Sequence, residues 1–173
     1  MPMAISVWDD GYGISVAAKY QTTKQNISEV LKGFERTTEK DGYQIFTCMG
    51  WDYPGLVEIY EKGTAKCREE HIPTLFHIRE MTQPQGHSTS GSHERYKSKE
   101  RLAWEEEFDC IRKMREWLIA TAVATTEELD AIEAESKKRV SEARKRAWDS
   151  HIGSIRIELA LKVRTQPGLA PDG

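Results

Sequence analysis

Apolar residues along this chain follow two kinds of spacing. Short, continuous apolar runs stand at residues 4–8, 43–49 and 73–78, each ended by a polar residue or Gly, and such runs are typical of buried β-strands. Between them, residues 26–34 and 52–70 repeat apolar side chains every three or four positions, which predicts helices with one buried face. The order strand, helix, strand, helix, strand predicts an α/β fold with a parallel sheet, flanking helices and right-handed crossovers.

Both predicted helices carry start signals, and residues 14–23 before the first read as an irregular loop. Asn26 is followed three residues later by Glu29, which resembles a capping box. Asp52 is a candidate N-cap, with Pro54 in the first helical turn. The inward faces are expected to carry Ile27, Val30, Leu31 and Phe34 in the first helix, and Leu56, Ile59, Tyr60, Gly63 and Cys67 in the second.

Beyond residue 98 the pattern becomes purely helical. Residues 98–120 predict one helix, and the capping box at Thr125-Thr126-Glu127-Glu128 starts another that runs towards Trp148. From residue 151 the signal fades, and residues 164–173 read as a linker or tail. The expected inward positions are Trp104, Phe108, Ile111 and Leu118 in the first helix, and Ile132, Val140, Ala143 and Ala147 in the second.

Composition narrows the functional classes. The chain has 173 residues and a net charge of −3, which gives no electrostatic case for binding nucleic acid. Its basic clusters near residues 137–146 are interleaved with Glu and indicate a solvated helix face. No apolar run approaches the roughly 20 residues that span a bilayer. The three unpaired cysteines favour reduced thiols and a cytoplasmic protein.

A polar loop follows the third predicted strand. Residues 83–98 contain Gly, Ser, Thr and three donors or cations, His87, Arg95 and Lys97, with almost no apolar side chain. Loops at the carboxyl ends of parallel strands are where open α/β sheets bind ligands, and such residues suit an anion. Composition alone favours a solvated surface loop for this stretch, because loops are polar by default.

Two adjacent carboxylates follow the first predicted strand. Asp9 and Asp10 stand directly before Gly11, and carboxylate oxygens are the ligands that Mg²⁺ prefers. Asp-Asp-Gly is also a common turn sequence, because Asp and Gly both favour turns. The residues by themselves leave both interpretations open.

The two loops together resemble a known family. Gly86-His87-Ser88-Thr89-Ser90 followed by Tyr96-Lys97-Ser98 is similar to the active-site loop of the thiamine-diphosphate-dependent 2-oxoacid dehydrogenases, in the alpha part of their decarboxylating component. Within this family, the sequence of the loop is most similar to that of the branched-chain (2-oxoisovalerate) enzymes. The resemblance implies that His87 is catalytic and lies with Ser88 at the cofactor diphosphate. Ser88 and Ser98 match the phosphorylation positions of mitochondrial members.

The Asp9–Tyr12 turn resembles the second half of that family's metal motif. The resemblance implies that Asp10 gives a side-chain oxygen and Tyr12 a backbone carbonyl to Mg²⁺, with Gly11 between them at the cofactor. The Gly-Asp-Gly first half of the motif is absent from this sequence. We therefore expect a thiamine-diphosphate-binding fold that is truncated at its N-terminal side and has a helical C-terminal extension.

The resemblance also implies an organisation and a reaction. Residues 1–150 would be the C-terminal half of a thiamine-diphosphate-binding dehydrogenase domain, and residues 151–173 a linker or tail. The chain would be part of an oxidoreductase of bacterial, cytoplasmic type that decarboxylates a 2-oxoacid, and the resemblance favours a branched-chain one. Its expected partners are a beta part, separate or fused, and a lipoyl-bearing acyltransferase, and alone it would be inactive. The alternatives are a non-catalytic fragment or assembly module, or a pyruvate- or 2-oxoglutarate-specific member.

Overall fold

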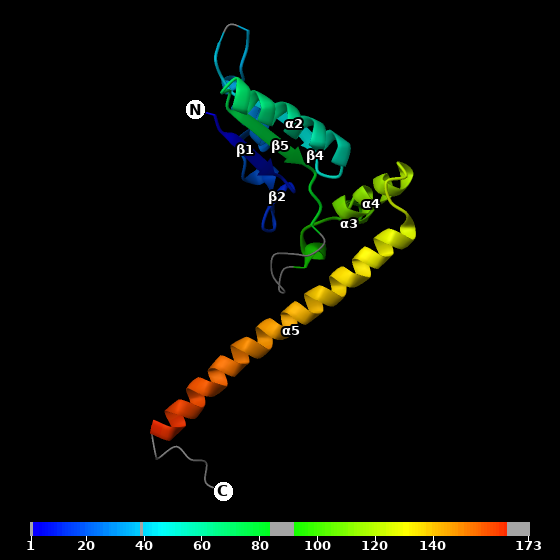
Figure 1. Cartoon of the computed structure of the whole chain (residues 1–173). Helices are drawn as coiled ribbons and strands as arrows, with labels where there is room; N and C mark the ends of the chain where they lie inside the picture. The colour runs from blue at the N-terminus through cyan, green and yellow to red at the C-terminus, as the bar shows by residue number, and fades with distance from the viewer. Residues whose placement is uncertain (1, 39, 84–91, 166–173) are drawn as a thin grey trace. The chain divides into compact units, whose positions relative to one another are not determined.

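The structure is a computed structural model that describes residues 2–38, 40–83 and 92–165, with side chains described as far as residue 162. It divides into two compact units, Met1–Thr121 and Ala122–Gly173, and each is described here by itself. The colour ramp of Figure 1 follows the first unit from blue to yellow-green.

A three-stranded parallel sheet forms the centre of the first unit. Its order is β1 (Ala4–Trp8), β5 (Thr74–Arg79) and β4 (Gln44–Met49), with β5 hydrogen-bonded to both neighbours (Figure 1). Both pairs are parallel, and Phe46 stands opposite Phe76 in the register. The predicted strands and their parallel arrangement are confirmed, as is the α/β fold class.

Strand β5 is buried on both faces, which explains its uninterrupted apolar run. Every residue from Thr74 to Ile78 is buried. On one face, Phe76 stacks on Tyr60 of helix α2 (Tyr53–Glu69) with ring centroids 4.3 Å apart. On the same face the Thr74 hydroxyl donates to the Gly63 carbonyl at 3.2 Å. Helix α2 therefore packs against the middle of the sheet, as its apolar stripe predicts.

Helix α2 begins where the sequence predicts. The Asp52 side chain accepts from the Gly55 amide at 3.1 Å, so it caps the helix, and Pro54 lies in the first turn. Gly63 and Cys67 are buried on the predicted inward side.

On the opposite face of β5, the segment around α1 (Ile27–Leu31) contacts His77 through the Ser28 hydroxyl. The Asn26 side chain caps this helix by accepting from the Glu29 amide at 3.2 Å. The helix is shorter than predicted, because a 3₁₀ turn, η3 (Lys32–Phe34), replaces its last turn. Phe34 is consequently 63% exposed, so its predicted inward position is wrong.

Strand β1 lies at the sheet edge with β5 as its partner, and its predicted burial is wrong. Ile5 is 36% and Trp8 58% exposed. A short apolar run does not distinguish a central strand from an edge strand, since both can be rich in large apolar residues.

The segment after β1 is more regular than the predicted loop. A small antiparallel hairpin pairs β2 (Tyr12–Gly13) with β3 (Val16–Ala17). Two 3₁₀ turns, η1 (Ala18–Tyr20) and η2 (Thr23–Gln25), then lead to α1.

The predicted helix over residues 98–120 is two helices. A 3₁₀ turn, η4 (His93–Arg95), precedes α3 (Lys99–Glu107) and α4 (Cys110–Ala120). The break occurs because the Asp109 side chain accepts from the Arg112 amide at 2.9 Å and so caps a new helix. Ile111, predicted to face inward, is 80% exposed as a result.

The second unit contains the long helix α5 (Thr126–Thr165). Its capping box is confirmed: the Glu128 amide donates to Thr125 Oγ1 at 3.2 Å, and the Thr125 amide donates to Glu128 Oε2 at 2.8 Å. The helix continues through residues 151–165, where the sequence signal fades, and the assignment of residues 151–173 as a linker or tail stays a prediction. All four positions predicted to face inward are exposed, so that prediction is wrong: Ile132, Val140, Ala143 and Ala147. Trp148 is exposed as well. Among the described residues, no helix combines the length and apolar character needed to cross a membrane.

Candidate functional site

The turn after β1 is built by its two carboxylates. Asp9 Oδ1 accepts from the Gly11 amide at 2.8 Å, and Asp10 Oδ1 accepts from the Tyr12 amide at 3.0 Å. Gly11 has a φ of +79°, which an L side chain rarely adopts. The turn interpretation of Asp-Asp-Gly is therefore confirmed, and each aspartate uses one oxygen to hold it.

Two oxygens of this turn remain available to a ligand. Within the described part of the chain, no group donates a hydrogen bond to Asp10 Oδ2. The Ala18 amide donates to the Gly11 carbonyl at 2.8 Å, so the pair Tyr12–Ala17 occupies a non-hydrogen-bonded position of the hairpin ladder. The Tyr12 carbonyl is thereby left out of the ladder. These are the two atoms that the resemblance assigns to Mg²⁺.

The turn lies at the carboxyl ends of two neighbouring strands. The Asp9 amide donates to the Ile78 carbonyl at 2.8 Å, and the Met81 amide donates to the Asp9 carbonyl at 3.0 Å. Asp9 thus ties the end of β1 to the end of β5. Ligands of open α/β sheets bind at this edge.

Two hollows flank the turn, and Asp10 and Tyr12 line both. One, of about 270 Å³, also contacts Trp8 and Asp9 and the 3₁₀ segment around Gln21. The other, of about 230 Å³, is bounded by Glu80 and Arg101. A ligand can therefore approach the turn from either side.

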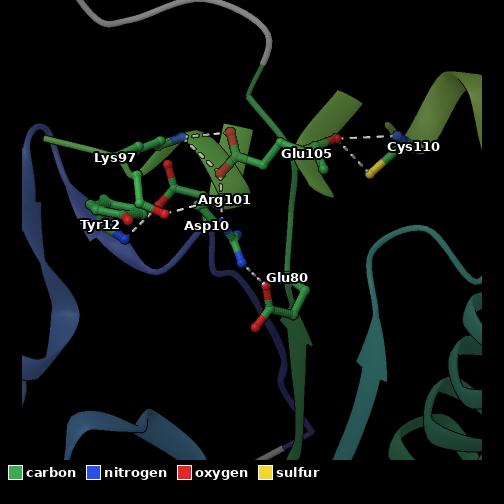
Figure 2. Close-up of polar contacts among 9 residues, drawn as sticks. Asp10, Tyr12, Glu80, Lys97, Arg101, Glu105 and Cys110 are labelled. Atoms are coloured by element: carbon green, nitrogen blue, oxygen red, sulfur yellow. Dashed lines mark hydrogen bonds and ion pairs between the residues drawn. The ribbon is translucent and has the colours of Figure 1, made fainter. Parts of the chain in front are cut away.

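The Tyr12 side chain connects this turn to the segment that follows the His87 loop. Its ring centroid lies 5.0 Å from Lys97 Nζ (Figure 2). The Tyr96 ring lies 5.5 Å from the same ring. Burial, together with the negative charge of Asp10, raises the pKa of the Tyr96 phenol. Residues from the two predicted motifs, 84 positions apart in the case of Tyr12 and Tyr96, thus meet in space.

A buried ionic network fixes that segment. Lys97 Nζ donates to both oxygens of Glu105, at 2.9 and 2.8 Å, and Arg101 Nε donates to Glu105 Oε1 at 2.9 Å. Arg101 also reaches Glu80 at 2.6 Å, beyond the end of β5 (Figure 2). The charge of Lys97, which the sequence offers to an anion, is therefore neutralised internally by Glu105.

The remaining predicted site residues fall in two groups. His87 and Ser88 lie outside the described residues, so their predicted roles are untested. Ser98 is described: its hydroxyl accepts from the Arg101 amide at 3.2 Å and caps α3.

The sequence did not reveal a polar relay behind the turn. His77 is fully buried; its Nε2 lies 2.8 Å from Asp9 Oδ2 and its Nδ1 lies 2.9 Å from the Ser28 hydroxyl. A lone His in an apolar strand gives no sign of its partners 49 and 68 residues away. The Asp–His–Ser order is that of a hydrolase triad, but Ser28 lies at the start of α1 and also bonds Asn26 Oδ1, at 2.7 Å.

The donor set fits a cation site that is shared with other groups. In the described ranges, no cluster of three or more His, Cys, Asp or Glu side chains could hold a metal ion. Asp10 and Tyr12 offer two oxygens, whereas Mg²⁺ takes about six and commonly keeps phosphate oxygens and waters among them. The turn is suited to complete the coordination of a metal–phosphate ligand.

A parallel α/β sheet with an oxygen-rich turn at the carboxyl ends of its strands is the arrangement at which open α/β proteins bind ligands. Comparison of the sequence with protein families goes further: the family model described as "Dehydrogenase E1 component" matches residues 1–155. The chain belongs to this family, and it is a component of a thiamine-diphosphate-dependent 2-oxoacid dehydrogenase, an oxidoreductase. A search of the curated proteins found no match. Members of the family generally work within multienzyme complexes.

Proposed function

We propose that this chain supplies one half of a Mg²⁺–thiamine diphosphate site in the decarboxylating component of a branched-chain 2-oxoacid dehydrogenase. One observation carries the proposal: Asp10 Oδ2 and the Tyr12 carbonyl are oxygens of the turn that have no partner among the described residues. They stand at the carboxyl ends of β1 and β5, beside hollows large enough for a small anionic group.

Each residue has a distinct part in this proposal. Asp10 and Tyr12 bind the metal, and Gly11, with its positive φ, allows the sharp turn between them. As the resemblance implies, His87 would donate to a diphosphate oxygen, with Ser88 at the same diphosphate. Thiamine diphosphate, when bound, supplies the chemistry that lets a 2-oxoacid lose carbon dioxide. The protein holds the diphosphate through the metal and excludes water from the reacting end.

The substrate and partners follow from the same resemblance. The sequence of the loop around His87 supports a branched-chain 2-oxoacid as the substrate. A lipoyl-bearing acyltransferase would be the partner that takes the acyl group. The other half of the metal motif and a beta part would come from elsewhere in the component. A cytoplasmic location stays a prediction.

The test is the Asp10→Ala variant in the complete component, with thiamine diphosphate binding measured calorimetrically at limiting and saturating Mg²⁺. Removing one of about six metal oxygens is expected to weaken cofactor binding at least tenfold at limiting Mg²⁺, and excess Mg²⁺ is expected to restore part of it. Asp10→Asn retains a side-chain oxygen, so its affinity for the cofactor at limiting Mg²⁺ should fall only several-fold.

Asp41 provides a matched control, because it is an exposed aspartate that also precedes a Gly. Asp41→Ala should bind like the wild type. Wild-type dependence on Mg²⁺ in Asp10→Ala would contradict the metal assignment. Failure of the complete wild-type component to bind thiamine diphosphate would favour the alternative, a non-catalytic assembly module.

A further inference from the structure

His77 is the most thoroughly buried ionisable side chain near the candidate site. It is 0% exposed and lies on strand β5, where its neighbours Phe76 and Ile78 point to the opposite face towards α2. An apolar side chain would fill such a position without the cost of burying a polar ring. The imidazole is therefore expected to serve a purpose beyond filling space.

The hydrogen-bond partners of the ring indicate which of its two nitrogens carries a hydrogen. The ionised Asp9 carboxylate has only acceptors, so His77 Nε2 carries the hydrogen and donates to Asp9 Oδ2 at 2.8 Å. On the other side, the Ser28 hydroxyl lies within reach of both His77 Nδ1, at 2.9 Å, and Asn26 Oδ1, at 2.7 Å. The ring thus links the start of α1 to the end of β1.

Asp9 transmits this link to the cofactor turn. Its Oδ2 accepts from His77 and its Oδ1 accepts from the Gly11 amide, so both oxygens of one rigid carboxylate are held. The orientation of the Asp9 carboxylate then fixes where Gly11 lies, and with it the Asp10 and Tyr12 oxygens that follow.

We propose that His77 is a positioning residue that sets the geometry of the Asp10–Tyr12 turn through the Asp9 carboxylate. Its consequence for cofactor binding rests on the function proposed above. The positioning itself concerns only this chain and can be measured without cofactor.

Two amide substitutions distinguish the hydrogen bond of His77 to Asp9 from its contact with Ser28. A Gln amide nitrogen reaches close to the position of imidazole Nε2, so His77→Gln can still donate to Asp9. An Asn side chain is shorter and reaches only the position of Nδ1, so His77→Asn can still bond Ser28 but loses Asp9. Both replace a buried ring by a buried amide, so each controls for the packing loss of the other.

The measurement is amide hydrogen exchange in the full 173-residue chain without cofactor, resolved to single residues by fragmentation mass spectrometry. Loss of a hydrogen bond that orients Asp9 is expected to reduce protection of the Gly11 amide about tenfold in His77→Asn. In His77→Gln the reduction should stay within about twofold. Ser28→Ala removes the hydroxyl that contacts His77 Nδ1 but leaves the bond to Asp9. Protection of the Gly11 amide should therefore change as little as in His77→Gln. Equal protection of Gly11 in the Asn and Gln variants would overturn the proposal.

The wild-type protein supplies a measurement that does not depend on either variant folding. Nitrogen-15 NMR of His77 is expected to show an Nε2–H proton in slow exchange with water, because it is buried and bonded to Asp9. Absence of that protonated Nε2, with the hydrogen on Nδ1 alone, would overturn the proposal.

A cofactor titration keeps the two proposals apart. If the complete component binds Mg²⁺–thiamine diphosphate, His77→Asn should raise the cofactor dissociation constant by about the same factor as it lowers Gly11 protection. His77→Gln should restore most of the affinity. If the wild type binds no cofactor, the function proposed above fails, whereas the Gly11 exchange still decides the role of His77.

Discussion

Helices α2 and α5 begin with the same kind of signal and differ in what surrounds them. Asp52 caps α2 and Thr125 caps α5, and both helices carry apolar residues at helical spacing. The apolar side of α2 packs on β5, where Gly63 and Cys67 are buried, whereas Ile132, Val140 and Trp148 of α5 are exposed. Caps and spacing therefore predict where a helix forms, but burial depends on a partner surface that local sequence does not specify.

The comparison extends to ion pairs. In the first unit the Lys97 and Glu105 side chains are 1% and 7% exposed, whereas Lys137 and Glu133 of α5 are 74% and 56% exposed. Water screens the second pair and not the first. The same two residue types should therefore contribute very differently to stability.

The largest expected effect comes from breaking the buried pair. Lys97→Met leaves Glu105 with Arg101 alone and should lower the free energy of unfolding by about 3 kcal/mol. Lys137→Met should change it by less than about 0.5 kcal/mol. Urea unfolding followed by tryptophan fluorescence measures both. Equal effects of the two variants would show that Lys97 is not buried in solution.

A double variant sharpens this result. Lys97→Met combined with Glu105→Leu removes both charges, so much of the loss should be recovered. Recovery would identify the unpaired carboxylate, and not the missing amine, as the source of the instability.

An intermediate effect is expected when the same substitution is made in each helix. A methyl group at Gly63 would overlap the Phe76 ring and lie 2.9 Å from Thr74 Cγ2, so Gly63→Ala should destabilise by about 1–3 kcal/mol. At Gly153 nothing lies within 4 Å of the added carbon, so Gly153→Ala should stabilise α5 by about 0.5–1 kcal/mol. Thermal unfolding measures the opposite signs, and two changes of the same sign would contradict the packing of α2 on β5.

The smallest expected effect is at the caps. Thr125→Ala removes the acceptor for the Glu128 amide and should cost about 1 kcal/mol, felt mainly as fraying of the first turn of α5. Asp52→Ala should fray α2 less, because tertiary packing on β5 holds that helix in place. Amide exchange at Glu128 and Gly55 compares them, and greater fraying at Gly55 would contradict this order.

The sequence predicted the strands, the parallel sheet and three N-caps because these depend on local patterns. It did not predict the exposure of β1 or Phe34, since these depend on which neighbours a segment meets. It missed the helix break because the capping capacity of Asp109 is hidden within a continuous helical pattern. The Asp10–Tyr12 turn was found through its oxygens, whereas the partners of His77 are distant in sequence and follow only from the fold.

The hydrogen bonds of Asp9 use its backbone and both carboxylate oxygens, and this has an evolutionary consequence. Its backbone amide and carbonyl and both carboxylate oxygens are all bonded, to Ile78, Met81, Gly11 and His77. A substitution at position 9 or 77 alone would leave a buried polar atom unmatched, so each is harmful without a change in the other. We expect these two positions to vary together among relatives, with Ser28 changing whenever the residue at 77 loses its acceptor at Nδ1.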